Sequence, residues 1–305
     1  MPEKACILLS TYNGEKFLRE LLDSLLSQSY GNYEIRVRDD GSTDKTRDIL
    51  SEYSSKYQNI VLRHGSNIGV ARSFFDLLEN AGDDCTYFAF CDQDDVWMGS
   101  KLEKAITMLN NCSQIEPAMY CSNYILCDEK MNLLKDPPSN NHIKPSFSNA
   151  LLENIAAGCT TVMNKNARSL ILKQRPKGFF AHDWWFYLVV SAFGQVIYDP
   201  TPTLYYRQHA SNVVGAKASM LMKWKSRLSR YLVDAQEGVV IRQTQEFEEI
   251  YGTMLKNENK NILSNFLTDQ NSIIRRCKYA LFGPARRQSL IDNIIFKLLY
   301  ILKRI

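Results

Sequence analysis

The sequence predicts an α/β fold with a mainly parallel, doubly wound sheet, flanking helices and a helical C-terminal region. Within the first 110 residues, four strand-like apolar runs alternate with four amphipathic helical patterns. Each strand pattern ends in a polar cluster, and the last ninety residues read as helices with basic faces. Because alternating strands and helices form right-handed crossovers, the strands are expected to lie parallel, with helices on both faces of the sheet.

The four cycles can be followed in order along the chain. Strands are expected at 5–11, 34–40, 59–65 and 86–92, where apolar runs have strand length. The helices after them are expected at Leu18–Leu26, from Asp44 to about Tyr57, around Phe74–Ala81 and from about Ser100 to Asn110. Thr43 or Asp44 is well suited to cap the second of these helices.

The pattern changes after residue 117. We expect a strand at 118–128, a loop rich in Pro and Asn at 136–145, a strand at 158–164 that leads into a helix, and an apolar helix at 182–194. A short strand at 195–199 and an extended segment with a polar end at 204–215 follow. This organisation predicts one large domain over 1–215 and a helical region over 216–305.

Composition restricts the class of protein. No N-terminal segment has the pattern of a signal peptide, and FYLVVSAF (186–193) and IIFKLLYIL (294–302) are shorter than a membrane span, which needs about 20 apolar residues. The 8 cysteines are scattered without a C-x-x-C motif, so neither a zinc site nor a disulfide framework is indicated. We therefore expect a protein of the reducing cytosol that does not cross a membrane.

The C-terminal region carries most of the positive charge. The net charge of the chain is +4, whereas the segment from Lys260 onward has nine Lys and Arg residues against two Asp residues. MLMKWKSRLSRYL (220–232) and NIIFKLLYILKRI (293–305) mix large apolar residues with cations, as helices on anionic membranes do. Alternatively, these helices pack their apolar stripe on the main domain and leave the charges in water. Nucleic acid is not expected as a partner, because the tail is strongly apolar and the polar clusters before it are acidic.

The polar clusters TYNGE (11–15), RDDGSTD (38–44), HGSNIG (64–69) and CDQDD (91–95) each follow one strand. Parallel sheets bind ligands beyond the carboxyl ends of their strands, so the four clusters should converge on one edge. Asp92, Asp94 and Asp95 would repel one another unless a cation lies among them, although a turn or a helix cap is the simpler interpretation of such a cluster.

The chemistry of this edge favours a nucleotide held through a metal ion. The sequence has neither a G-x-G-x-x-G nor a P-loop motif, which argues against the usual dinucleotide and P-loop sites. Carboxylates would repel a bare phosphate, so a phosphate ligand here needs a divalent cation as a bridge. Oxygen ligands suit Mg²⁺ or Mn²⁺.

Four segments carry a resemblance to a known family: TYNGEKFLRELLDSLLSQSY, VRDDGSTDKT, SNIGVARSF and FCDQDDVWMGSKLEK. In order and spacing they resemble the nucleotide-binding half of family 2 glycosyltransferases with the GT-A fold, and a looser resemblance extends to about residue 215. The resemblance implies a metal-dependent enzyme that uses a nucleotide-sugar donor, with 1–110 as the nucleotide-binding half and 111–215 as the acceptor half.

The resemblance also implies roles for the nucleotide-binding residues. Thr11 and Tyr12 would flank the base with Asn13 beside them, and Asp40 would accept a hydrogen bond from the pyrimidine N–H with Asp39 nearby. Gly69 and Arg72 would lie near the ribose and the diphosphate. Asp92-x-Asp94 would be the D-x-D motif, with Asp94 on the metal and Asp92 directed toward the ribose or the same metal.

Further roles follow from the second half of the motif pattern. Asp183 would be the general base, although His182 replaces the more common Glu before it; the alternative is a simple charge at a helix N-terminus. His209 is either a third metal ligand or a histidine facing solvent. Asp95, Trp97, Trp184 and Trp185 are candidates for contact with the donor or acceptor sugar, while a helix cap for Asp95 and core packing for the aromatic residues are the alternatives.

The segments YRQHASNVVG and CDQDDVW are similar to the rhamnosyltransferase-like subgroup of bacterial surface-polysaccharide assembly. That resemblance implies inverting transfer of L-rhamnose from dTDP-L-rhamnose to a glycan or polyprenyl-linked acceptor. It also implies a cytoplasmic enzyme, with a peripheral position on the inner face of the plasma membrane as an option. A UDP-glucose or UDP-galactose donor is the nearest alternative. A nucleotide-binding scaffold without turnover is the alternative from another class.

Overall fold

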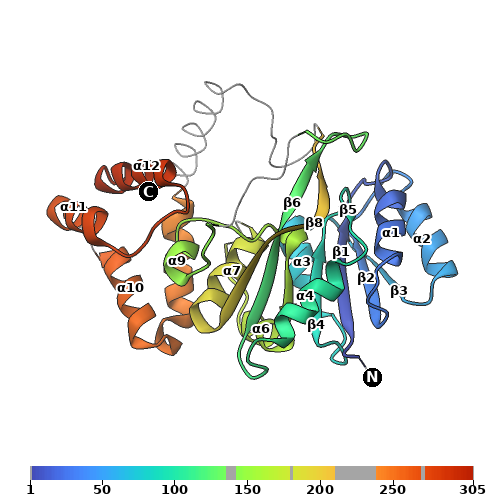
Figure 1. The fold of residues 1–305 in the computed structure, drawn as a ribbon, viewed down its shortest axis with the longest axis horizontal. Helices are drawn as coiled ribbons and strands as arrows, with labels where there is room; N and C mark the ends of the chain where they lie inside the picture. Colours follow the sequence, from blue (N-terminus) through green and yellow to red (C-terminus); the bar gives the residue numbers. More distant parts are fainter. Residues whose placement is uncertain (1, 135–141, 179–180, 210–237, 269–271, 305) are drawn as a thin grey trace.

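The computed structural model describes residues 2–134, 142–178, 181–209, 238–268 and 272–304. Its centre is an eight-stranded sheet in the order β3-β2-β1-β4-β7-β6-β8-β5 (Figure 1). The parallel strands β1 (Ala5–Thr11), β2 (Tyr33–Asp39), β3 (Ile60–His64) and β4 (Tyr87–Cys91) correspond to the four predicted strands. The predicted doubly wound α/β fold is confirmed.

The second half of the sheet is mixed. β7 (Val162–Asn164) lies antiparallel to both β4 and β6 (Ala118–Cys127). β8 (Gln195–Arg207) runs parallel to β6, and β5 (Val96–Trp97) pairs antiparallel with β8 at the sheet edge. Because β7 is antiparallel to both of its neighbours, β4 and β6 are parallel to each other, and so is β8. The carboxyl ends of these three strands therefore lie at the same edge of the sheet.

Two sequence predictions in this half need correction. The predicted strand 158–164 begins with the 3-10 helix η1 (Gly158–Thr160), in which the Thr160 and Thr161 hydroxyls donate to the Ala157 and Gly158 carbonyls. Such local bonds from a side chain to the backbone compete with strand pairing. The two segments predicted at 195–199 and 204–215 form one strand as far as Arg207, because register shifts in its pairing with β6 let it continue past its prolines. Residues 210–215 lie outside the described residues.

Helices cover both faces of the sheet. α1 (Leu18–Leu26), α2 (Thr46–Lys56) and α4 (Lys101–Asn110) share one core with the β1 side chains Ala5, Ile7 and Leu9. α3 (Val70–Glu79), α5 (Phe147–Ala150), α6 (Lys165–Ile171) and α7 (His182–Phe193) share the other core with Cys6 and Leu8. This alternation along β1 is the period of two that a strand buried on both faces requires. The second helix begins at Thr46 after the N-cap residue Lys45, which makes no capping bond with its side chain, so the predicted cap at Thr43 or Asp44 needs correction. The Asp44 carboxylate does accept from the Thr46 N–H over 3.0 Å in the turn before the helix.

A glycine joins α7 to β8 at the amino edge of the sheet. A side chain on Gly194 would place its Cβ atom 1.9 Å from the carbonyl oxygen of Pro117, which precedes β6. The next residue, Gln195, donates its N–H to that same carbonyl over 3.0 Å. The close approach of the two backbones therefore requires glycine at this position.

The C-terminal helices α9 (Val239–Tyr251), α10 (Asn257–Thr268), α11 (Ile273–Phe282) and α12 (Leu290–Ile301) lie beyond α7, at the end of the molecule opposite α1 and α2 (Figure 1). A short 3-10 helix, η2 (Gly252–Met254), follows α9. The Phe247 ring packs 6.2 Å from that of Trp185 in α7, which joins α9 to the main core. The predicted basic segment 220–232 lies outside the described residues. Among the helices that the structure describes, none has the length and apolar composition to cross a bilayer.

Candidate active site

The ends of β1, β2 and β3 lie side by side, because Thr11 pairs with Asp39 and Asp39 with His64 in the sheet register. β4 ends at Cys91, opposite Leu9. A pair of hydrogen bonds joins the first and fourth polar clusters: the Tyr12 N–H donates to Oε1 of Gln93 over 2.8 Å, and Nε2 of Gln93 donates to the Tyr12 carbonyl over 3.0 Å. The polar clusters therefore meet at the carboxyl edge, as predicted.

Asp39 is the most enclosed acidic group of this edge. Its carboxylate accepts hydrogen bonds from the Thr11 hydroxyl (3.3 Å), from the Ser42 hydroxyl (2.5 Å) and from Nε of Arg47 (2.7 Å). Burial raises the pKa of Asp39, but the hydrogen bonds from Ser42 and Arg47 outweigh it and the pKa is lowered. Asp39 therefore stays ionised and fixes the loop after β2. Asn13, with φ of 50°, joins the same loop, since its N–H donates to the Ser42 hydroxyl over 2.9 Å.

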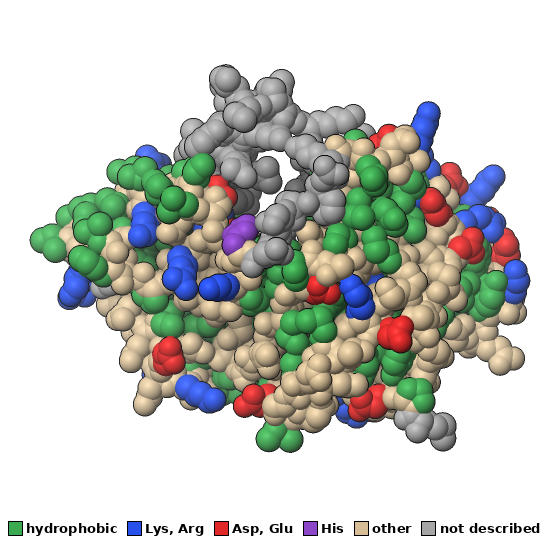
Figure 2. All heavy atoms as spheres, in the orientation of Figure 1, with side chains coloured by type: hydrophobic (Ala, Val, Ile, Leu, Met, Phe, Trp, Pro, Cys, Tyr) green, Lys and Arg blue, Asp and Glu red, His purple; other side chains and the backbone are tan. Residues whose placement is uncertain are grey.

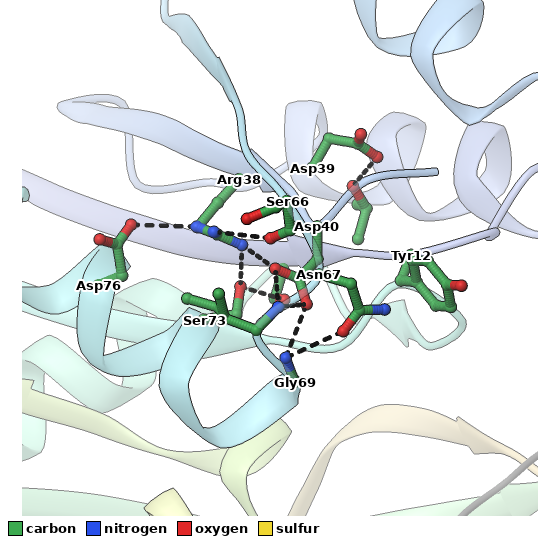
Figure 3. A network of polar contacts seen from close by, with 12 residues as sticks. Tyr12, Arg38, Asp39, Asp40, Ser66, Asn67, Gly69, Ser73 and Asp76 are labelled. Carbon is green, nitrogen blue, oxygen red and sulfur yellow. Dashed lines mark hydrogen bonds and ion pairs between the residues drawn. The ribbon is translucent and has the colours of Figure 1, made fainter. Parts of the chain in front are cut away.

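Asp40 holds the loop that leads into α3 (Figure 3). Its carboxylate accepts from the N–H groups of Ile68 (3.1 Å) and Gly69 (3.0 Å) and is paired with Arg38. Gly69, with φ of 81°, is the residue before α3, and the exposed Arg72 lies in the first turn of that helix. Asp40 thus orders the loop and helix start that carry Gly69 and Arg72, the two residues predicted to contact the ribose and diphosphate. The predicted hydrogen bond between Asp40 and the nucleotide base stays a prediction.

The loop after β4 and the end of β8 bring an acid and a histidine together. Oδ2 of Asp94 lies 2.6 Å from Nε2 of His209, although the two residues are 115 positions apart in the sequence. The His209 ring also packs on Phe17, with 5.1 Å between ring centroids. The alternative of a histidine that faces solvent does not fit this arrangement, because the His209 side chain is only 10% exposed.

Two further carboxylates lie close to Asp94. One ligand atom each from Asp92, Asp95 and Cys159 lies within 4.8 Å of the others. Burial, with the charges of Asp94 and Asp183, raises the pKa of Asp92 to about 7, and burial beside Asp94 and Asp92 raises the pKa of Asp95. Oδ2 of Asp95 is buried without a hydrogen-bond partner among the described residues. Crowded, buried carboxylates beside an imidazole have the charge and the donor atoms to fit a divalent cation.

Asp183 opens α7 next to this cluster. Oδ2 of Asp183 accepts from the Gly158 N–H over 3.0 Å, and Oδ1 accepts from the N–H of Trp184 over 2.8 Å. Its charge contributes to the raised pKa of Asp92, so the two carboxylates are close enough to interact electrostatically. The residue before it, His182, stacks on Phe74 at 4.2 Å in the core, and burial lowers the pKa of His182. A glutamate at that position would need a polar partner that this core pocket does not supply.

The four residues predicted as candidates for sugar contact lie in different environments in the structure. Trp97 and Trp185 are each 3% exposed and belong to the two hydrophobic cores, which corresponds to the packing alternative rather than to a sugar contact. Trp184 is partly exposed, and its indole N–H donates to the Ala150 carbonyl over 2.7 Å. Asp95 does not cap α4, whose N-cap is Ser100; it accepts from the Arg207 N–H over 3.2 Å instead.

Two buried cations support the site and were not predicted. Nζ of Lys101 donates to the Cys159 carbonyl over 2.9 Å, and burial lowers the pKa of Lys101 to about 8. Nε of Arg207 donates to the Asp94 carbonyl over 2.8 Å, and Arg207 is 1% exposed. The only sequence signal for Arg207 is its place in a strand two residues before His209, since burial of a charged side chain cannot be read from the pattern.

The sheet order and this carboxyl edge are those of the GT-A fold. The fold is similar to that of S. aureus TarS (residues 1–349) solved with UDP-GlcNAc, with a TM-score of 0.61 at 17% identity over 99% of this chain and 81% of that one. It is also similar to the mannosyltransferase PcManGT from Pyrobaculum calidifontis, solved with GDP-Man and Mn²⁺, with a TM-score of 0.52 at 16% identity over 98% and 85% of the two chains. At these identities the likeness concerns the fold alone.

The chain belongs to glycosyl transferase family 2, whose family model matches residues 6–166. Among curated relatives, the dTDP-rhamnosyl transferase RfbG of Shigella flexneri is 32% identical over 71% of this chain and 77% of its own length. The UDP-Glc:alpha-D-GlcNAc-diphosphoundecaprenol beta-1,3-glucosyltransferase WfgD of Escherichia coli is 32% identical over 52% of this chain and 58% of its own length. The chain is thus a nucleotide-sugar glycosyltransferase, as the motif resemblance implied.

Proposed function

We propose that this glycosyltransferase moves an L-rhamnosyl group from dTDP-L-rhamnose to a hydroxyl of a glycan or lipid-linked acceptor, with inversion at the anomeric carbon. The observation that carries the reaction is the 2.6 Å contact between Asp94 and His209, close to Asp92, whose pKa the charges of Asp94 and Asp183 both raise. The rhamnosyl donor is supported by the 32% identity to RfbG. The lipid-linked acceptor is supported by the similarity to WfgD, a glucosyltransferase that acts on a GlcNAc-diphosphoundecaprenol acceptor.

Asp92, Asp94 and His209 are the residues that would hold Mg²⁺ or Mn²⁺. The fit is supported by the unpartnered Oδ2 of buried Asp95 and by the raised pKa values of Asp92 and Asp95, since both indicate negative charge that the described residues do not balance. When bound, such a cation would stabilise the negative charge on the leaving diphosphate. Arg207 would keep the loop in place for this, through its bond to the Asp94 carbonyl.

Asp183 is the proposed general base. Its two hydrogen bonds to backbone N–H groups hold the carboxylate in one orientation at the start of α7. The proton of the acceptor hydroxyl passes to a carboxylate oxygen of Asp183 as the acceptor oxygen forms a bond to the anomeric carbon. The bond from that carbon to the diphosphate oxygen breaks, and its electron pair leaves with the diphosphate. A single displacement of this kind inverts the anomeric centre.

The nucleotide would bind across the ends of β1, β2 and β3. In this proposal Thr11 and Tyr12 flank the base with Asn13 beside them, Asp40 accepts a hydrogen bond from the pyrimidine N–H with Asp39 nearby, and Gly69 and Arg72 lie near the ribose and diphosphate. Tyr12 supports this arrangement, because its side chain is 46% exposed at the edge where the loops meet. The ordered backbone around Gly69, held by Asp40, offers a fixed surface to the diphosphate.

The donor is tested by calorimetric titration of the full chain with dTDP-L-rhamnose, UDP-glucose and UDP-galactose, each with and without Mn²⁺. We expect dTDP-L-rhamnose to bind at least about tenfold more tightly than either UDP-sugar, a difference of about 1.4 kcal/mol. Tighter binding of UDP-glucose would favour the second candidate, a glucosyltransferase, for which the relative WfgD provides support. Donor binding without turnover on any lipid-linked acceptor would favour the scaffold.

A further inference from the structure

α11 and α12 each have two apolar faces, and one of these is packed inside the molecule. The ring of Phe266 in α10 lies 5.8 Å from that of Tyr279 in α11 and 5.6 Å from that of Tyr300 in α12. The Tyr300 hydroxyl also donates to the Phe266 carbonyl over 2.8 Å. Aromatic packing of this kind is enough to hold the two helices on α10, so their second apolar faces are not needed for it.

The second faces are exposed. In α12, Leu290, Ile294 and Leu298 are 75%, 50% and 56% exposed, and their spacing of four residues places them along one side of the helix. In α11, Ile274, Leu281 and Phe282 are 78%, 69% and 80% exposed. We call these six side chains the outer face. Figure 2 shows hydrophobic side chains gathered where α11 and α12 lie, with Lys and Arg next to them.

Isolated exposed leucines are ordinary, whereas a contiguous apolar patch on neighbouring helices marks a site of interaction. The charge around the outer face identifies the kind of partner. Residues 272–304 contain eight Lys and Arg residues and a single acidic residue, Asp292. Arg275, Lys278 and Arg286 are exposed. An apolar face with cations beside it matches a surface that offers acyl chains under anionic headgroups.

We propose that the outer face docks on an anionic phospholipid surface, with α11 and α12 lying in the plane of that surface. A second copy of the chain is the less favourable occupant, because two faces surrounded by the same positive charge would repel each other. Nucleic acid is also less favourable, because it would leave the apolar side chains in water. This docking is independent of the donor sugar, and it can be measured without any donor present.

The apolar part of the proposal is tested with Leu290→Gln/Ile294→Gln/Leu298→Gln in the full chain. Co-sedimentation is measured with vesicles of phosphatidylcholine alone and with vesicles containing about 30% phosphatidylglycerol. We expect the triple variant to lower the partition coefficient for the anionic vesicles at least about tenfold, because three apolar side chains are removed from the lipid. The matched control, Val61→Gln/Ile115→Gln/Leu133→Gln, changes three apolar residues that are 44%, 87% and 62% exposed elsewhere, and should bind as the wild type does.

The electrostatic part is tested with Arg275→Gln/Lys278→Gln against the control Lys56→Gln/Lys173→Gln. Each lost cation should lower binding to the anionic vesicles about fivefold, and the loss should shrink in high salt. This variant also decides the question if the triple variant fails to fold, because it leaves every apolar side chain in place.

Four results would overturn the proposal. In the vesicle assay these are equal binding of the triple variant and its control, equal binding of the wild type to both vesicle types, and unchanged binding of the charge variant. The fourth is a dimer, detected by sedimentation velocity, that the triple variant abolishes while the wild type does not bind vesicles. The last result would assign the outer face to a second copy. None of these results bears on the donor, so the failure of this proposal and the failure of the proposed reaction are distinguishable.

Discussion

Replacement of Arg207 by Met should loosen the carboxyl edge of the sheet around Asp94 while keeping the space that the Arg207 side chain fills occupied. The Arg207 guanidinium donates to the Asp94 carbonyl (2.8 Å) and the Glu129 carbonyl (2.7 Å), and it pairs with Glu20 (2.5 Å). Its carbon atom Cζ also lies 4.5 Å from the centre of the Phe17 ring. Methionine can occupy the same apolar space beside that ring, but it donates no hydrogen bond.

The magnitude follows from the groups that would lose a partner. A carbonyl left unpaired in a buried place costs about 1 to 3 kcal/mol. Of the two carbonyls that Arg207 serves, that of Asp94 is partly buried, whereas Glu129 is exposed and its carbonyl can bond water instead. The ion pair adds little, because the Glu20 side chain is 52% exposed and water screens it. We therefore expect the free energy of unfolding to fall by about 1 to 3 kcal/mol. Urea unfolding followed by far-UV circular dichroism measures this difference.

Glu20→Gln is the matched control, since it removes only the exposed half of the ion pair and should cost about 1 kcal/mol or less. Calorimetry adds a functional measurement: Mn²⁺-dependent donor binding should weaken at least about tenfold in Arg207→Met and stay close to wild type in Glu20→Gln, because only the first change frees the Asp94 loop. A loss of stability below about 1 kcal/mol in Arg207→Met would refute the reasoning, because the partly buried Asp94 carbonyl should not lose its donor at a smaller cost.

Three other predictions concern single carboxylates. Asp94→Ala should abolish the metal-dependent part of donor binding, and an affinity that calorimetry finds unchanged with and without Mn²⁺ would exclude its proposed role. Asp183→Asn should keep donor binding and lower kcat at least about 100-fold, so full activity would remove Asp183 from the mechanism. Burial raises the pKa of Glu34, but hydrogen bonds from Lys4 and Arg36 outweigh it and the pKa is lowered. The ionised group therefore stabilises the fold above its ordinary pKa of 4.5, and this stabilisation is lost as the pH falls below that value. Wild type and Glu34→Gln should differ in urea midpoint at pH 7 and converge toward pH 3, and a constant difference would contradict this.

The parts of the fold that the sequence predicts well are those set by local periodicity. The four cycles of strand and helix were found because β1 and β4 are apolar runs, β2 has apolar residues at alternate positions, β3 begins with three apolar residues, and the helices after them have one apolar side. β5 was missed because two residues, Val96 and Trp97, carry no periodicity. The start of η1 was missed because its threonines favour a strand by composition, and only the hydrogen bonds to the preceding turn decide the outcome.

The candidate site divides in the same way. The convergence of the polar clusters followed from the topology, and the motif resemblance placed Asp94 on the metal and left His209 as either a third metal ligand or a histidine facing solvent. The roles of Lys101 and Arg207 could not be predicted, because a cation that is buried and one that faces water look the same in a sequence. The burial of Trp97 and Trp185 could not be predicted for the same reason. In α12, both sides of the helix are apolar, so periodicity alone does not tell which side packs on α10.

The joint at Gly194 connects the proposed base to a proposed metal ligand. α7 begins with Asp183 at the carboxyl edge and ends at the amino edge, where β8 starts its return toward His209. Asp183 and His209 therefore lie at the two ends of one helix–strand unit, α7 and β8. The turn between α7 and β8 lies at the opposite edge of the sheet, where Gly194 packs against the Pro117 carbonyl. A methyl group added at that turn would push the helix–strand unit away from β6 and carry both ends with it. The relative position of the proposed base and the proposed metal ligand thus depends on a backbone contact on the opposite edge of the sheet, far from either group.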